Sequence, residues 1–159
     1  MNLQSVDTST SEGGGSGFSV VSLAGIRELD FTMIKRKLQD PDEGKGWSAE
    51  MCDAAEADYR RFLALKRAYP EREIVPNRVV DAFWHQHILD TEAYAADCER
   101  VFGYFVHHFP YFGMRGDADK AALVQAFEDT SALYERHFGV ALAGETGRCR
   151  TQCKPVACK

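Results

Sequence analysis

The stretch DAFWHQHILDTEAYAADC, residues 81–98, carries the pattern that decides the fold. Its apolar side chains recur at the spacing of one face of an amphipathic helix, and they are interrupted by two histidines and several acids. Asp90 and Thr91 offer a new helix start in the middle of the stretch. We therefore expect one helix to end there and a second to run from Thr91 to Phe102, with Gly103 as its terminator.

Neighbouring segments show the same helical periodicity. Ser48 and Asn77 are good N-caps, Asp117 is expected to cap the last helix, and Gly139 is expected to end it. The expected helices cover about residues 29–38, 48–68, 77–88, 91–102 and 117–138. Because strand-like alternation is scarce and no segment repeats, we expect an all-α fold, a compact bundle of about five helices.

Apolar positions at helical spacing predict which side chains form the core. Met33 is expected on the buried face of the first helix, and Met51 on the buried face of the second. Phe83 and Trp84 are large apolar residues of the central stretch, and both are expected to be buried. Replacement of a buried tryptophan by alanine costs about 3–5 kcal/mol, so Trp84 should matter for stability.

The chain of 159 residues has the length and composition of one globular domain with a segment at each end. Residues 1–21 are rich in Gly and Ser and have little to bury, so we expect them to be disordered. Residues 22–140 are expected to form the helical domain. Residues 141–159 form a basic, cysteine-rich tail, which we expect to be flexible.

Composition argues against several classes of partner. The chain carries 19 basic and 24 acidic residues, a net charge of −5, which gives no general attraction for nucleic acid or for an anionic membrane. The N-terminus lacks the pattern of a signal peptide, and no apolar run approaches the roughly 18 residues that span a bilayer. We therefore expect a cytoplasmic protein without a nucleic-acid or membrane partner.

The histidines of the central stretch cannot act together on one helical face. Two residues apart on a helix corresponds to about 200° of rotation, so His85 and His87 point in different directions. Asp81 lies one turn before His85, and its carboxylate could accept the ring N–H and leave the other nitrogen free as a ligand or a base. His107 and His108 supply further imidazoles from the aromatic segment that follows.

The segments YRRFLALK, residues 59–66, and VPNRVVDAFWHQHILDTEAYAADCERVFGYFVHHFP, residues 75–110, resemble the glycine-rich domain-containing protein-like family. The resemblance extends from about Ser22 to Gly139 and implies a helical domain. It carries over no settled activity and no ligand, and the appended regions that suggest RNA binding in longer plant relatives are absent here. The positions that match the family pattern are Asp81, Trp84, His85, His87, Asp90, Tyr94, Cys98, Gly103, His108 and Pro110.

Several polar residues within one pattern suggest a clustered site. We expect a zinc or copper site with His85, His87 and His108 as ligands. The supporting residues are expected to be Asp81, Trp84, Asp90, Tyr94 and Cys98. One alternative is purely structural: one histidine of each pair hydrogen-bonds in the core while the other faces water. Another is general base catalysis by His85, oriented by Asp81.

The C-terminal tail places three thiols, Cys149, Cys153 and Cys158, among four cations. Nearby cations lower the pKa of a thiol and raise its thiolate fraction, so these residues could bind Cu(I) or Zn(II). Alternatives are a disulfide with one thiol left free, modification by a partner enzyme as in a ribosomal-peptide precursor, or no specific role.

Together these observations predict a small, non-enzymatic metal-binding or thiol-redox protein that uses the tail and the histidine-rich helix. No nucleophile elbow, P-loop or dinucleotide fingerprint argues for an enzyme. The alternative is an interaction module with a protein partner, in which the WHxH motif is purely structural.

Overall fold

The computed structural model describes residues 21–142, and over these residues the chain forms five α-helices and no strand. The helices are α1 Thr32–Gln39, α2 Ala49–Ala68, α3 Arg78–Leu89, α4 Thr91–Phe102 and α5 Asp117–Phe138. The predicted all-α fold is therefore confirmed. The predictions for residues 1–20, and for the tail from residue 143 on, fall outside the described part of the chain.

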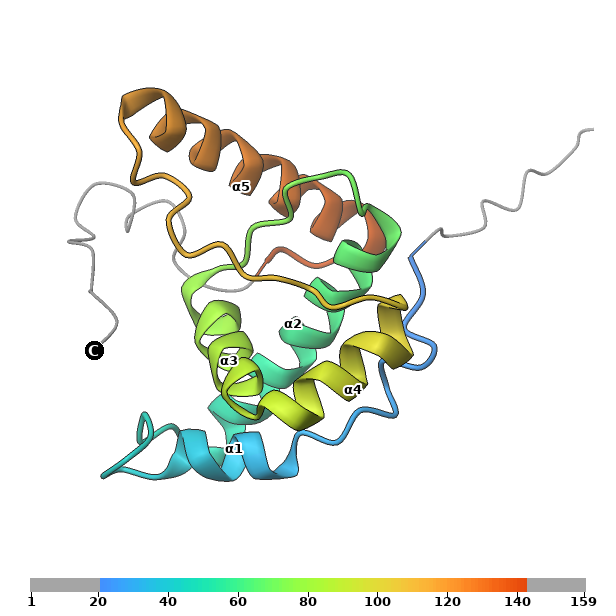
Figure 1. Ribbon diagram of the computed structural model, residues 1–159, viewed down its shortest axis with the longest axis vertical. Coiled ribbons are helices and arrows are strands. Elements are labelled where there is room, and N and C mark those ends of the chain that lie inside the picture. Colours follow the sequence, from blue (N-terminus) through green and yellow to red (C-terminus); the bar gives the residue numbers. More distant parts are fainter. Residues whose placement is uncertain (1–20, 143–159) are drawn as a thin grey trace, which may run out of the picture.

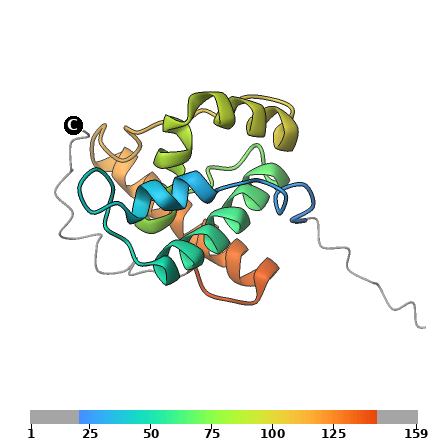
Figure 2. The same ribbon diagram turned by 90° about the horizontal axis from the view of Figure 1, so that it is seen from below.

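Helix α2 lies at the centre of the arrangement. It packs against α1, α3 and α5, while α3 also contacts α1 and α4. Figure 1 shows α1 and α5 at opposite ends of the molecule, with α3 and α4 forming a bent pair between them, and Figure 2 shows α4 to one side of α2. None of the helices in residues 21–142 is both long enough and apolar enough to cross a membrane.

Local signals set most of the helix ends. The Ser48 hydroxyl accepts a hydrogen bond from the Met51 amide, and the Asn77 side chain accepts one from the Val80 amide. Gly103 and Gly139 end α4 and α5 in the left-handed conformation that glycine adopts without strain. The predicted break after α3 is also confirmed, since Asp90 separates α3 from α4.

The start of α5 differs from the prediction. Gly116 is the N-cap, and Asp117 is the first helical residue, with no side-chain cap. The carboxylate of Asp119 organises the approach instead, accepting hydrogen bonds from the amides of Gly113 at 2.7 Å and Arg115 at 3.1 Å. The acid that shapes this turn is therefore Asp119, two residues after the predicted cap Asp117.

Aromatic rings fill the core between α1, α2 and α3. Tyr59 of α2 packs on Phe31 at 5.4 Å and on Phe83 of α3 at 5.1 Å between ring centroids. Trp84 is buried as predicted and packs on Phe62 at 5.1 Å. These contacts hold α3 firmly against α2, so side chains on the outer face of α3 project from a rigid base.

Two methionines predicted to lie in the core are exposed. Met33 and Met51 are 64% and 39% exposed, so both predictions are wrong. In α1 the neighbouring Ile34 takes the buried position, and in α2 Cys52 does. Adjacent positions on a helix differ by 100°, and the packing partner decides which of two neighbouring apolar residues turns inward.

Candidate metal centre

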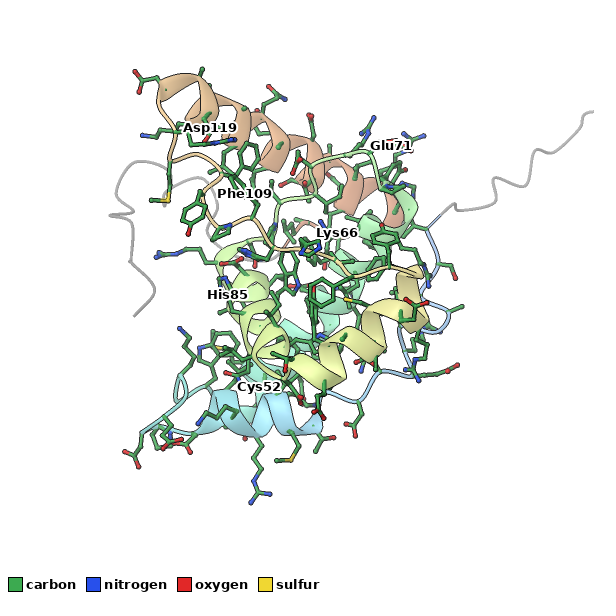
Figure 3. The ribbon with its side chains drawn as sticks, in the orientation of Figure 1. Cys52, Lys66, Glu71, His85, Phe109 and Asp119 are labelled. Atoms are coloured by element: carbon green, nitrogen blue, oxygen red, sulfur yellow. The ribbon has the colours of Figure 1, made fainter. Side chains whose placement is uncertain are left out.

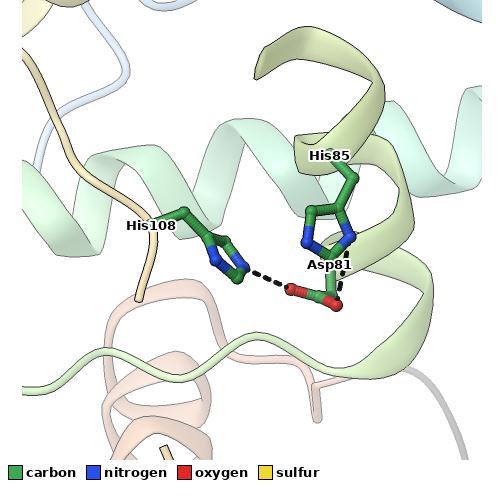
Figure 4. Close-up of side chains that lie close together, drawn as sticks. All are labelled: Asp81, His85 and His108. Atoms are coloured by element: carbon green, nitrogen blue, oxygen red, sulfur yellow. Dashed lines mark hydrogen bonds and ion pairs between the residues drawn. The ribbon is translucent and has the colours of Figure 1, made fainter. Parts of the chain in front are cut away.

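The partly exposed face of α3 carries Asp81 and His85 one helical turn apart. Residues four positions apart lie on the same side of a helix. Here the Oδ2 atom of Asp81 lies 3.5 Å from Nδ1 of His85. The other oxygen, Oδ1, lies 3.1 Å from Nε2 of His108, which approaches from the segment after α4. Figure 4 shows the Asp81 carboxylate between the two imidazoles.

His108 reaches this position because the segment after α4 runs extended over the core. Side chains alternate sides along an extended chain. Val106 is buried and His108 is mostly covered, while Phe105, His107 and Phe109 face solvent. Consecutive histidines therefore have different surroundings, and only the second one meets Asp81.

Two core residues fix the extended segment. The Trp84 indole N–H donates to the Tyr94 hydroxyl at 3.0 Å, and this hydroxyl donates to the Val106 carbonyl at 2.5 Å. The indole ring also packs on the His108 imidazole at 4.5 Å between centroids. Trp84 and Tyr94 thus position His108.

The three side chains are close enough to share an ion. One ligand atom from each of Asp81, His85 and His108 lies within 4.8 Å of the other two. Ligand atoms around a tetrahedral zinc ion are about 3.3 Å apart, so side-chain rotations of modest size would close the set. The side chains of Asp81, His85 and His108 are 36%, 40% and 16% exposed, which leaves one side of the cluster open to water.

His87, the third predicted ligand, does not join this cluster. It is buried in the core, where Nδ1 lies 2.9 Å from the Tyr59 hydroxyl and Nε2 lies 3.2 Å from Oδ2 of Asp97. Burial lowers the pKa of His87, and the nearby Asp97 opposes this shift without cancelling it. The two histidines of the WHxH motif therefore separate, as their 200° offset on an ideal helix requires.

The remaining predicted residues lie away from the cluster or outside the described chain. Asp90 is exposed at the junction of α3 and α4. Cys98 is a buried free thiol on the inner face of α4. Within residues 21–142, the group of Asp81, His85 and His108 is the one such set of three or more potential ligands. The thiols Cys149, Cys153 and Cys158 fall in the tail beyond the described residues.

Two polar partners of His87, Tyr59 and Asp97, were not predicted from the sequence. Tyr59 begins the segment YRRFLALK, and Asp97 immediately precedes Cys98. Lys66 was also given no role, although it falls at an inward position of the α2 periodicity. A lysine at a position where the helical period expects an apolar residue could have marked Lys66 as unusual.

Comparisons with known proteins support a family assignment only. A family model described as UCP032817-like matches residues 24–132. The assignment to the glycine-rich domain-containing protein-like family is therefore wrong. Three residues that carried that resemblance, Trp84, His87 and Tyr94, are buried. No curated protein and no solved structure matches the chain.

Proposed function

The chain belongs to the UCP032817-like family, an uncharacterised one, and we propose that this member binds a divalent transition metal ion through Asp81, His85 and His108. The observation that carries the proposal is the approach of three potential ligand atoms to within 4.8 Å of one another. Two come from one turn of α3, and the third comes from a segment more than twenty residues away.

The chemistry of the ligands favours zinc. Two imidazole nitrogens and one carboxylate oxygen are donors that Zn²⁺ accepts readily, at bond lengths near 2.0–2.2 Å. Copper(II) binds nitrogen and oxygen donors more tightly still, so it is the expected competitor. Three protein ligands leave a fourth position for water, and the exposed side of the cluster gives an ion access.

The surroundings of the cluster also suit a metal site. An imidazole binds more tightly when its ring is held in one orientation. His108 is held by its contact with Trp84 and by the hydrogen bond from Tyr94 to the adjacent backbone. The proposal is for metal binding alone, and no reaction is assigned to the bound ion.

Calorimetric titration of the metal-free protein with Zn²⁺ tests the proposal. To separate this site from the tail thiols, the full chain is used with Cys149, Cys153 and Cys158 replaced by serine. We expect one equivalent of zinc to bind. Asp81→Asn and His108→Gln should each weaken binding by at least about 10-fold, since each removes a ligand.

His107→Gln is the matched control, because it removes the neighbouring imidazole without touching the cluster. Its zinc affinity should equal that of the parent chain. The absence of a stoichiometric zinc site, or an equal affinity in the Asp81→Asn and His108→Gln variants, would overturn the proposal. The same titration of the unsubstituted chain measures any additional zinc bound by the tail, which is the separate expectation for those thiols.

A second candidate function is protein binding through the segment that joins α4 to α5. Contiguous exposed apolar side chains mark interaction surfaces. In this segment the following large side chains are exposed: Tyr104, Phe105, Phe109, Tyr111 and Met114. A photo-crosslinking amino acid at position 111 would identify a contacting protein. The partner protein identified in this way should, once purified, bind the parent chain and bind the Phe109→Ser variant more weakly.

A cytoplasmic location is part of the proposal. Cys52 and Cys98 are free thiols in the core, and a reducing compartment keeps thiols in this state. Fractionation of the native host, followed by detection of the protein with an antibody, tests the location. Recovery of the protein in a membrane or secreted fraction would contradict it.

A further inference from the structure

A hollow of about 330 Å³ lies between the end of α2 and the extended segment after α4. Its walls include Lys66, Tyr69, Arg72, Tyr104, Phe105 and His107. Figure 3 shows Lys66 near the middle of the molecule, beside the segment that joins α4 to α5. Ligand pockets usually measure roughly 300–1,000 Å³, so the volume of this hollow lies at the lower end of that range.

Two cations line the hollow, and neither forms an ion pair with another residue of the range 21–142. The Lys66 ammonium lies over aromatic rings, 5.4 Å from the centroid of Trp84 and 5.7 Å from that of Phe62. The Arg72 guanidinium stacks on Tyr69 at 5.4 Å. Within the described part of the chain, no carboxylate oxygen lies within 4.0 Å, the limit for an ion pair, of a side-chain nitrogen of either cation.

The position of Lys66 is unusual for a lysine. Most lysines keep their ammonium group in water. Here burial lowers the pKa of Lys66, and the one acid that opposes the shift is Glu73, whose side chain is exposed. A charge held against aromatic rings, with water partly removed, gains from a nearby anion more than a fully solvated lysine does.

We propose that this hollow binds a small organic anion, with a carboxylate or phosphate group held by Lys66 and Arg72 and an apolar or aromatic body against the surrounding rings. The guanidinium group offers paired donors that match two oxygens of such an anion, and the lysine adds a point charge. Tyr69, Tyr104 and Phe105 supply flat surfaces for the body of the ligand. His107 lies at the same wall and can donate a further hydrogen bond.

This anion site is distinct from the proposed metal site, and it does not depend on it. The alternating segment after α4 points His107 to the hollow and His108 to Asp81. Trp84 is the residue the two places share, since its ring contacts both His108 and Lys66. The fluorescence of Trp84 can therefore report binding in the hollow.

Titration with phenyl phosphate and with benzoate tests the proposal, with phenol as the uncharged probe. The metal-free full chain is used in a buffer free of phosphate, with Trp47 replaced by phenylalanine so that Trp84 alone reports. We expect saturable binding of at least one anion and much weaker binding of phenol. Comparison of phenyl phosphate with benzoate decides which anionic group the hollow prefers.

Variants of the two cations complete the test. A hydrogen bond to a charged group contributes about 1.5–3 kcal/mol, so Lys66→Met and Arg72→Gln should each weaken anion binding about 10-fold or more. Lys120→Met removes an exposed lysine of α5 and is the matched control, with unchanged affinity expected. Arg72 is exposed, so its variant remains informative if Lys66→Met fails to fold.

The outcomes separate this site from the metal site. Asp81→Asn should leave anion affinity unchanged, whether or not zinc binding is lost. The inference is overturned if neither anion binds in a saturable way, if phenol binds as tightly as phenyl phosphate, or if Lys120→Met weakens binding as much as Lys66→Met does.

Discussion

The Tyr59 hydroxyl lies 2.9 Å from Nδ1 of His87, 28 residues later in the chain, and both side chains are buried. The other ring nitrogen, Nε2, lies 3.2 Å from the Asp97 carboxylate. An ionised carboxylate only accepts hydrogen bonds, so Nε2 carries the proton and Nδ1 accepts from Tyr59. Burial lowers the pKa of His87, and the ring is therefore neutral at pH 7. The second histidine of the WHxH motif thus ties α2 to α3 and α4.

Tyr59→Phe should destabilise the protein by about 1–3 kcal/mol, because it leaves the buried Nδ1 of His87 without a donor. The free energy of unfolding, measured by urea denaturation, checks this. Tyr111→Phe is the control, since that side chain is exposed and its hydroxyl can bond to water. Equal unfolding free energies for the two variants would show that the Tyr59 hydroxyl contributes nothing.

The stability of the protein should fall as the pH is lowered through about 6.5, the ordinary pKa of histidine. The pKa of His87 is lower in the folded state than in the unfolded state, so below that pH the unfolded chain binds more protons. The stabilising contribution of neutral His87 is therefore complete above pH 6.5. It declines with decreasing pH until the folded-state pKa is reached.

Comparison with a His87→Asn variant isolates this contribution. The asparagine oxygen can accept from Tyr59 but does not titrate. Burial also lowers the pKa of His137, which remains in both chains and contributes equally to both. Unfolding free energies measured between pH 5 and pH 8 should therefore change less for His87→Asn than for the parent. Parallel pH curves would contradict the prediction.

Features set by neighbouring residues were predictable from the sequence. Ser48 and Asn77 cap their helices, and Gly103 ends α4, because the backbone groups they satisfy lie within a few residues. The divergence of His85 and His87 also follows from the helical repeat alone. Local geometry therefore accounts for most of the architecture.

Features that depend on distant segments were not predictable. Met33 and Ile34 were both expected on the buried face of α1, but only Ile34 packs against the other helices and Met33 is exposed. His108 was a candidate ligand without a known partner, because its meeting with Asp81 depends on the path of a segment without regular structure. For the same reason Lys66 could not be placed beside Tyr104 and His107.

Tyr94→Phe should weaken zinc binding at the proposed site by about 10-fold, although Tyr94 is not a ligand, because groups that orient metal ligands have effects of this size. The variant removes the hydrogen bond to the Val106 carbonyl and the acceptor of the Trp84 N–H. His108, two residues after Val106, then loses its fixed position. Zinc calorimetry in the chain with the tail cysteines replaced measures the effect.

Tyr59→Phe is the control for this experiment, since it also removes a buried hydroxyl but contacts none of the proposed ligands. Its zinc affinity should remain that of the parent chain. If the two tyrosine variants lose zinc affinity equally, general destabilisation rather than the position of His108 explains the change.

Tyr134→Phe should loosen α5 more than the rest of the bundle. The Tyr134 hydroxyl donates to Oδ1 of Asp58 on α2, and Arg61 bonds to the same oxygen at 2.9 Å. Loss of the hydroxyl removes one of the two donors to a buried carboxylate, which costs about 1–3 kcal/mol. Among the larger contacts between helices, α5 takes part in one, its contact with α2. We therefore expect the cost to appear as local opening of α5.

Amide hydrogen exchange measures this opening. Exchange of buried α5 amides around Leu133 should become about 5- to 100-fold faster, while that of α3 amides around Phe83 changes little. Ser131→Ala is the control, because it removes a hydroxyl that bonds within α5 to the Phe127 carbonyl and not to α2. Equal acceleration in α3 and α5 would mean that the two helices open only together and that the Tyr134 contact does not control α5 by itself.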